Sequence, residues 1–265
     1  MEDDQYLIKS VDKALTILEY IAKAGEPVSL SLLSSRLDIR KSTLFGLLRT
    51  LQKHRFVVQH GKQYVLGHRC HALSQAFLSR HRLPVRSYEL LGQLANACQA
   101  VVKYGTLSVM RLAELVTANP SEPVLLDPLS PIEDSQDCNA HALARGQAIL
   151  AFLSDDELAE RLASIDTLPS FTPNTITDVA DLRARLLEVR RQGYAVSRAE
   201  YTLDSFGIGA PVFDINQIPV AAVGLSVPIG HADPNTIAQC VNYTMQTAAS
   251  ITELLGGQAH AMLND

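Results

Sequence analysis

The sequence predicts an α+β fold in two parts: a small N-terminal part of helices and one hairpin, and a larger part with a mainly antiparallel sheet. Helical periodicity dominates the first 83 residues, and strand-like runs alternate with amphipathic helices after Pro84. The charge also changes sign. Residues 1–83 hold 13 Lys and Arg against 7 Asp and Glu, whereas residues 84–265 hold 10 against 21. A basic part joined to an acidic one favours a polyanion-binding module at the N-terminus.

The N-terminal part is expected to contain three helices followed by a hairpin. The first helix has apolar residues at helical spacing, with Ser10 as its expected N-cap and Gly25 as its end. Gly61 lies between two short alternating runs, where a hairpin needs a permissive residue. The helices and strands are expected at residues 10–25, 29–37, 41–53, 56–58 and 63–66. Helix, short helix, turn, helix and hairpin is the order of a winged helix-turn-helix.

The rest of the chain predicts a linker helix and one α+β domain. Pro84 interrupts the helical pattern, so we expect a DNA-binding-type domain at residues 1–67, a linker helix at 68–84 and a second domain at 85–265. In the second domain, helices are expected at residues 85–98, 144–153, 154–165, 179–192 and 234–255. Strands are expected at residues 100–109, 111–117, 123–129, 193–196, 207–213 and 220–227.

Composition argues against a membrane or exported protein. No run approaches the roughly 18 apolar residues of a membrane span, and the acidic start MEDDQYLIKS does not resemble a secretory signal. Cys70, Cys98, Cys138 and Cys240 lie far apart with no paired spacing. We therefore expect reduced thiols in a cytoplasmic protein.

The third helix carries the residue types that a DNA-reading helix needs. Cations contact phosphates, hydroxyls bond phosphates or base edges, and an apolar group contacts the thymine methyl. The candidate DNA-contacting residues, with Lys62 at the wing tip, are Arg40, Lys41, Ser42, Thr43, Phe45, Arg49 and Lys62. The alternative interpretation is a solvated helix with ordinary surface charge.

Four segments together resemble one family, the isocitrate lyase regulator (IclR) family of bacterial transcription regulators. They are SVDKALTILEYIAKAGEPVSLSLLSSRLDIRKSTLFGLLRTLQKHRFV with YVLGHR after the wing, AHALARGQAILAFL, and GYAVSRAEY followed by GIGAPVFDINQIPVAAVGLSVP. The resemblance implies a GAF-like effector-binding domain, an operator DNA partner, and a homodimer or tetramer. It also implies a small effector, often an organic or aromatic acid, and no cofactor.

The resemblance also implies an effector pocket in the second domain. Carried over to this sequence, its residues are Ala144, Arg145, Gly146, Ser197, Gly207, Gly224 and Ser226. A helix N-terminus and two serine hydroxyls suit an anion. Arg145 can pair with a carboxylate, fill the pocket or point to solvent. Gly207 and Gly224 stand where bulkier residues occur in relatives, which suggests a roomier ligand.

Two positions depart from the family pattern, and two others resemble unrelated sites. Gly46 replaces an arginine of the third helix, so a phosphate contact is lost or the helix docks more closely; Gln147 replaces the lysine of a GKA motif. The segment around Ser226 resembles the G-x-S-x-G motif of serine hydrolases. Ser226 is expected within a strand, however, whereas the nucleophilic serine of that motif lies at a turn between a strand and a helix. Cys138 and His141 provide two metal ligands where zinc needs four.

The sequence therefore predicts a transcription regulator, repressor or activator, whose operator binding a small molecule modulates. We expect no catalytic residues and no metal site. Two alternatives stay open: a small-molecule-hydrolysing enzyme with an appended DNA-binding domain, and a winged helix that contacts only proteins.

Overall fold

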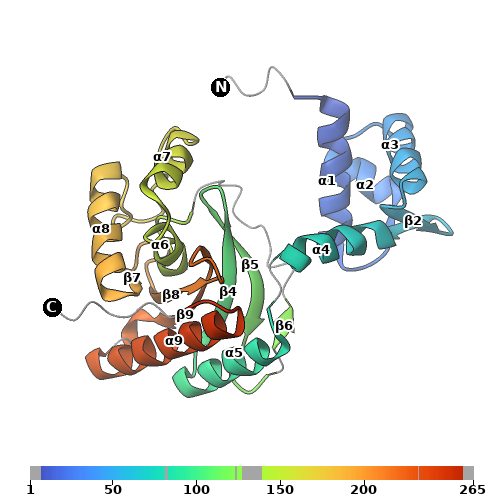
Figure 1. Cartoon of the computed structure of the whole chain (residues 1–265). Coiled ribbons are helices and arrows are strands. Elements are labelled where there is room, and N and C mark those ends of the chain that lie inside the picture. The colour runs from blue at the N-terminus through green and yellow to red at the C-terminus, as the bar shows by residue number, and fades with distance from the viewer. Residues whose placement is uncertain (1–6, 81–82, 123, 127–138, 232, 259–265) are drawn as a thin grey trace. The chain divides into compact units, whose positions relative to one another are not determined.

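The computed structural model describes residues 7–80, 83–122, 124–126, 139–231 and 233–258 (Figure 1). The chain divides into two compact units, Met1–Arg82 and Leu83–Asp265. The finer division into a DNA-binding domain, a linker helix and an effector domain stays a prediction. Within the described residues, no helix has the length and apolar character to cross a membrane.

The first unit contains the predicted helices and hairpin, with one additional strand. Its elements are α1 (Lys9–Ala24), β1 (Val28–Ser29), α2 (Leu30–Leu37), α3 (Lys41–Lys53), β2 (Val57–His60), β3 (Gln63–Leu66) and α4 (His68–Arg80). The short strand β1 pairs with β3 and widens the hairpin to a three-stranded sheet in the order β1-β3-β2. Its two residues are too few to produce a periodic pattern in the sequence.

The ends of the helices follow local capping rules, with one exception to our expectation. The Ser29 hydroxyl accepts the Leu32 amide at the start of α2, and Gly25 ends α1 with a left-handed φ of 64°. Ser10 does not cap α1 as predicted. The helix begins earlier, with Ile8 at the N-cap position and no side-chain cap.

The core of the first unit determines which face of α3 is exposed. Leu44, Leu48 and Leu51 are buried along one side of α3, and they pack with Ile17 and Leu33 of the other helices. Each such buried side chain contributes about 1.5–3 kcal/mol through the hydrophobic effect. The polar side of α3 therefore faces away from the core.

The second unit is a single antiparallel sheet covered by helices on both faces. Its helices are α5 (Val85–Cys98), α6 (Ala144–Leu150), α7 (Asp155–Ala163), α8 (Val179–Gln192) and α9 (Pro234–Leu254). Its strands are β4 (Val101–Ser108), β5 (Arg111–Ala118), β6 (Leu125–Leu126), β7 (Ala195–Arg198), β8 (Ser205–Phe213) and β9 (Pro219–Pro228). The strand expected at residues 123–129 is only two residues long where it is described, and residues 127–138 lie outside the description.

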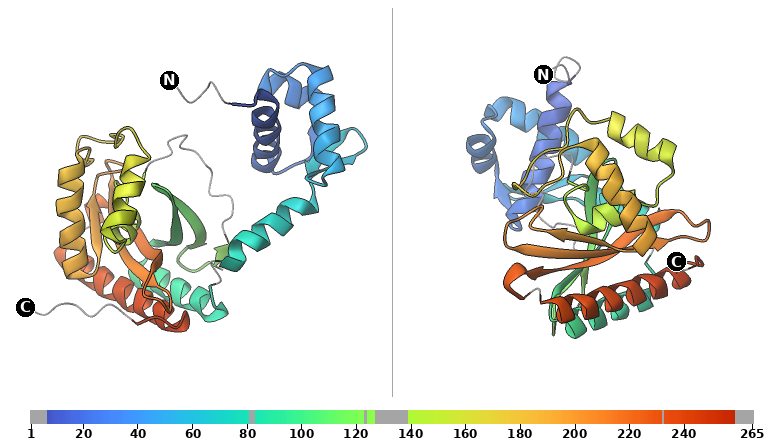
Figure 2. Two further views of the ribbon diagram at one scale, coloured as in Figure 1. Left: turned by 45° about the horizontal axis from the view of Figure 1, so that its top comes forward. Right: turned by 90° about the vertical axis from the view of Figure 1, so that its left-hand side faces the viewer.

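The strands follow the order β6-β5-β4-β9-β8-β7, and every pairing between neighbours is antiparallel. Helices α5 and α9 lie side by side on one face, and α6 with α8 covers the other (Figures 1 and 2). A large apolar cluster fills the space beneath α6, α7 and α8. This arrangement places the start of α6 directly over the centre of the sheet.

Candidate functional site

The seven residues predicted to contact DNA are all exposed on the first unit. On α3, Lys41, Phe45 and Arg49 follow one another at four-residue spacing and share one face. The Arg49 guanidinium carbon lies 5.8 Å from the centre of the Phe45 ring, which is a cation–π distance. Phe45 is 51% exposed, so this aromatic ring lies on the surface and is not part of the core.

The wing and one glycine complete this face. Gly61 lies in the turn of the hairpin with a left-handed φ of 62°. The Gln59 side-chain amide donates a hydrogen bond to the Gly61 carbonyl at 2.8 Å. The turn thereby holds the exposed Lys62 at the wing tip. A Cβ atom on Gly46 would meet no atom within 4 Å, so the core does not require a glycine in the middle of α3.

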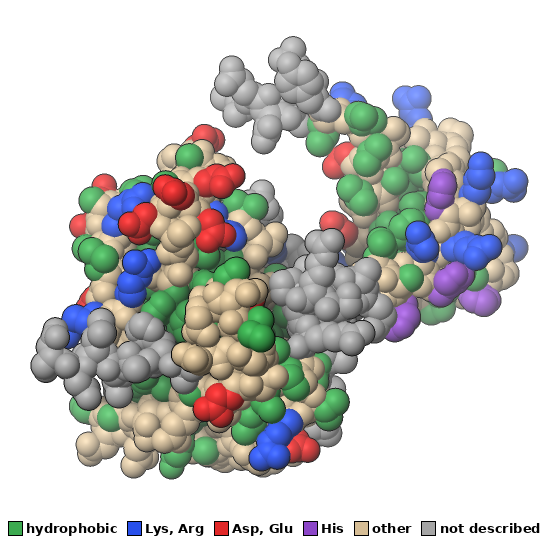
Figure 3. Space-filling view, viewed as in Figure 1, with side chains coloured by type: hydrophobic (Ala, Val, Ile, Leu, Met, Phe, Trp, Pro, Cys, Tyr) green, Lys and Arg blue, Asp and Glu red, His purple; other side chains and the backbone are tan. Residues whose placement is uncertain are grey.

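The two units differ in surface charge as the sequence indicates. On the face drawn in Figure 3, the His side chains lie on the first unit, Lys and Arg side chains lie on both units, and most of the Asp and Glu side chains lie on the second. A polyanion is therefore attracted to the unit that carries α3 and the wing.

The second unit has a cavity of about 80 Å³ between the start of α6 and the sheet. Six of the seven predicted effector residues line it: Ala144, Arg145, Ser197, Gly207, Gly224 and Ser226. Gly146 does not line the cavity. A Cβ atom there would lie 2.2 Å from the Ala140 carbonyl oxygen, so this glycine permits close packing of α6.

The sheet register explains why residues distant in sequence meet here. Ser197 is opposite Gly207, which is opposite Ser226 on the next strand. Gly224 lies two residues before Ser226 in β9, so both belong to the same face of the sheet. Lys103 of β4 is opposite Gly224 and also lines the cavity.

Arg145 fills the space that Gly224 leaves. A Cβ atom on Gly224 would lie 2.5 Å from the Arg145 Cγ atom and 2.3 Å from the Ile208 carbonyl oxygen. The expectation that Gly224 provides room for a larger ligand is therefore wrong, because the aliphatic part of Arg145 occupies that room. At Gly207 a Cβ atom would meet only ordinary contacts, the nearest being the Ala144 Cβ at 3.4 Å.

Glu114 of β5 holds Arg145 in this position. Arg145 Nη2 donates to Glu114 Oε1 at 2.8 Å, and Lys103 Nζ donates to Glu114 Oε2 at 2.6 Å. Burial of Glu114 acts to raise its pKa, but the charges of Arg145 and Lys103 outweigh burial, and the pKa of Glu114 lies below its usual value. The sequence analysis did not identify Glu114 or Lys103 as part of the site. The only indication in the sequence is that each places a charged residue within a half-buried strand.

The two serines at the cavity differ in availability. Ser197 is buried, and its hydroxyl donates to the Ala142 carbonyl at 3.1 Å. Ser226 is exposed at the other end of the same row. The expectation that both hydroxyls are free donors is therefore wrong for Ser197, whose proton is engaged by the backbone.

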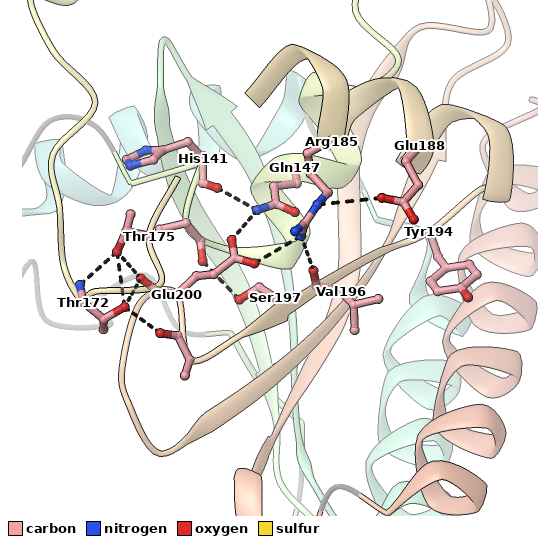
Figure 4. A network of polar contacts seen from close by, with 12 residues as sticks. His141, Gln147, Thr172, Thr175, Arg185, Glu188, Tyr194, Val196, Ser197 and Glu200 are labelled. Carbon is pink, nitrogen blue, oxygen red and sulfur yellow. Dashed lines mark hydrogen bonds and ion pairs between the residues drawn. The ribbon is translucent and has the colours of Figure 1, made fainter. Parts of the chain in front are cut away.

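A buried polar network lies beside the cavity (Figure 4). The Gln147 side-chain amide donates to Glu200 Oε2 and to the His141 carbonyl, each at 2.7 Å. Arg185 of α8 pairs with the other oxygen of Glu200 at 3.2 Å. Burial raises the pKa of Glu200 above its usual value, although Arg185 and Gln147 act in the opposite direction. The network fixes the loop after β7, which contributes Tyr201 to the cavity lining.

Thr172 and Thr175 anchor that loop from the other side. The hydroxyl of Thr172 donates to the Ala199 carbonyl at 2.6 Å, and that of Thr175 donates to the Glu200 carbonyl at 2.6 Å. His141 is buried, and its Nε2 lies 2.9 Å from the Pro169 carbonyl oxygen. Cys138 lies outside the described residues, within which no cluster of three or more metal-ligand side chains occurs.

Two family models match the chain, and together they cover most of it. The model described as "Bacterial transcriptional regulator IclR C-terminal" matches residues 78–253, and the "IclR helix-turn-helix domain" matches residues 10–61. The chain belongs to the IclR family. Membership confirms the predicted fold class, with a helix-turn-helix unit and an antiparallel α+β unit, and identifies the chain as a DNA-binding transcription regulator of the effector-responsive type.

IclR-family relatives align over nearly the whole chain. The transcriptional repressor IclR of Escherichia coli K12 is 25% identical over 252 residues, covering 94% of this chain and 91% of that protein. The glycerol operon regulatory protein of Streptomyces griseus is 27% identical, covering 94% and 97% respectively. The crystal structure of the Thermotoga maritima IclR is 25% identical with a TM-score of 0.72, covering 94% and 100%. These IclR-family proteins are transcription regulators rather than enzymes.

Proposed function

We propose that this regulator binds operator DNA through α3 and the wing, and that a small acid bound in the second unit changes operator affinity. The observation that carries the DNA-binding assignment is the exposed face of α3, where Lys41, Phe45 and Arg49 are aligned and Arg49 stacks on Phe45. The proposed interface also includes Arg40, Ser42 and Thr43 at the start of α3, and Lys62 at the wing tip. Such a helix enters the major groove while the wing contacts the flanking backbone.

The effector site is the cavity beneath α6. Six carried-over residues meet there, and Arg145 and Lys103 provide cationic groups for a carboxylate. We infer that the ligand shifts the population of DNA-competent geometry, so that effector and operator affinities are reciprocally coupled. Gly146 supports the site indirectly by allowing α6 to pack closely. We infer a cytoplasmic protein, where both metabolite and operator are accessible.

The regulator is proposed to act as a homodimer or tetramer on paired half-sites. Apolar side chains at helical spacing along the start of α1, those of Ile8, Val11 and Leu15, are each more than half exposed. With the linker helix α4, they provide a surface that a second copy can cover. A dimer would place two α3 helices on successive turns of the duplex.

The test uses full-length chain and a duplex that it selects from a random DNA library. A carboxylic-acid library is screened for molecules that raise the melting temperature of the chain, since a ligand at 100 times its Kd adds about 2.7 kcal/mol. Molecules that stabilise the chain should change duplex affinity in the same solution. Ligands that stabilise the chain without any effect on duplex affinity would contradict the proposed coupling.

A further inference from the structure

The effector cavity contains an unequal set of charges. Arg145 and Lys103 bond the same carboxylate, that of Glu114, one at each oxygen. Two cationic side chains thus share one anionic partner. The Arg145 side chain is 11% exposed and that of Glu114 is 16% exposed, so water screens this pair poorly, whereas the Lys103 side chain is 32% exposed. A net positive charge in such surroundings favours binding of a further anion.

Arg145 also has a donor that is not used. Its Nη2 bonds Glu114, whereas Nη1 is buried and has no acceptor among the residues that the structure describes. Guanidinium groups commonly bind carboxylates through two parallel N–H···O bonds. Here one nitrogen serves Glu114 and the other lacks a partner, at a residue that lines the cavity.

The cavity offers little space beside Arg145. The Arg145 Cγ and Cδ atoms lie over Gly224, and the space that remains is about 80 Å³. Pockets for drug-sized ligands hold about 300–1,000 Å³. Val101, Leu143 and Leu225 contribute to the rest of the lining, which suits a short apolar tail beside a single charged end.

We propose that Arg145 selects a short monocarboxylate as the effector, and that Glu114 is an internal counter-ion with which this ligand competes. The proposal rests on the assignment of the cavity to the effector. In the free protein Glu114 holds Arg145 over Gly224 and neutralises part of its charge. The ligand carboxylate competes with Glu114 for the Arg145 guanidinium, and its tail occupies the remaining space.

The test is calorimetric titration of the full-length chain with acetate, butyrate, hexanoate and benzoate, with acetamide and butyramide as uncharged controls. Wild type should bind acetate or butyrate at least tenfold more tightly than hexanoate and benzoate, and should not bind the amides measurably. Glu114→Gln removes the competing charge at nearly constant size, so it should bind the short acids at least tenfold more tightly.

Arg145→Ala should bind the short acids at least tenfold more weakly than wild type. It should bind hexanoate or benzoate more tightly, because the space over Gly224 opens. Arg145→Lys retains the charge but not the second N–H edge, and should also lose at least tenfold, which covers the case where Arg145→Ala does not fold. Arg183→Ala on the exposed side of α8 is the matched control and should not change any affinity.

Two results would overturn the proposal: no monocarboxylate binds wild type or Glu114→Gln, or Glu114→Gln binds the short acids no more tightly than wild type. The duplex-binding assay separates this failure from that of the proposed function. If only uncharged molecules change duplex affinity, the regulator assignment holds and the carboxylate proposal fails. If short acids bind with the predicted pattern but leave duplex affinity unchanged, the coupling fails and the carboxylate site holds.

Discussion

Arg145 lies against Gly224 so closely that a methyl group on Gly224 would come within 2.5 Å of the Arg145 Cγ atom. The same methyl group would be 2.3 Å from the Ile208 carbonyl oxygen, which belongs to the backbone of β8 and cannot turn aside. Gly207 lines the same cavity, yet its nearest neighbour would be 3.4 Å away. The two glycines therefore have different reasons for being small.

Alanine substitutions distinguish them. Gly224→Ala should destabilise the chain by about 1–3 kcal/mol, because Arg145 and β8 must both move. Gly207→Ala should change the free energy of unfolding by no more than about 0.5 kcal/mol. Urea unfolding monitored by circular dichroism measures both. Equal losses for the two variants would contradict the close packing of Arg145 on Gly224.

A second pair of glycines tests the first unit. A methyl group added to Gly46 or to Gly25 would meet no atom within 4 Å, but Gly25 has a φ of +64°. Gly46→Ala should stabilise α3 by about 1 kcal/mol, since alanine is the better helix former. Gly25→Ala should destabilise the chain by about 1 kcal/mol, because a left-handed backbone disfavours a side chain. Urea unfolding measures both changes.

Gly46 occupies a position where the family pattern has an arginine. The duplex affinity of Gly46→Ala distinguishes a lost phosphate contact from closer docking of α3. If α3 docks closely on DNA through Gly46, the variant should be more stable and yet bind the selected duplex more weakly. If only a phosphate contact is absent, affinity should stay unchanged. A less stable Gly46→Ala would contradict the open surroundings of Gly46.

The serines at the cavity should separate binding from stability. Ser226→Ala removes an exposed hydroxyl at the cavity and should weaken binding of a charged effector about ten- to a hundred-fold, as loss of a bond of about 1.5–3 kcal/mol implies. Ser197→Ala removes a bond to the Ala142 carbonyl and should lower stability by about 1 kcal/mol. Calorimetry with a molecule from the stability screen and urea unfolding measure the two effects. Equal effector affinity for Ser226→Ala and wild type would place the pocket elsewhere.

The carboxylates of Glu114 and Glu200 should give the free energy of unfolding opposite dependences on pH. The pKa of Glu114 is lowered in the folded chain, so its contribution is present above the ordinary glutamate range and is lost as the pH falls through the folded pKa. The pKa of Glu200 is raised. Its folded form holds the proton to higher pH, so stability decreases as the pH rises from the ordinary range through the folded pKa.

Glu114→Gln should therefore flatten the loss of stability on acidification, and Glu200→Gln should flatten a loss on raising the pH above the ordinary range. Unfolding in urea from about pH 3 to about pH 7 compares each variant with wild type. Glu200→Gln should also be less stable at neutral pH, since an amide nitrogen would face the donor of Gln147 or Arg185. Parallel pH profiles for all three proteins would contradict these assignments.

Most of the fold follows from patterns that are local in sequence. The stripe of leucines in α3, the capping serine of α2 and the Gly61 turn each act within a few residues. The pairing of β4 with β9 does not, because these two strands are separated by more than a hundred residues. The short strand β1 could not be predicted, since its two residues carry no periodicity.

The candidate site was predictable only where a family pattern existed. That pattern led to Arg145, Ser197, Gly224 and Ser226, but it did not indicate which of them are free to bind a ligand. Burial and the Ala142 carbonyl decide this for Ser197. Glu114 could not be predicted as a partner of Arg145, because only the register of β4 and β5 brings it under α6.

The measurement that tests the central claim most directly is the salt dependence of binding to the selected duplex, for wild type, Arg49→Ala and Arg183→Ala. Wild type and Arg183→Ala should bind with the same affinity, and the logarithm of the binding constant should fall linearly with the logarithm of salt concentration. Arg49→Ala should bind more weakly. Its salt slope should fall by about one if Arg49 contacts a phosphate, or it should lose about 1–3 kcal/mol of discrimination at one base pair if Arg49 reads a base. Affinity of Arg49→Ala equal to wild type at moderate salt would contradict docking through this face of α3.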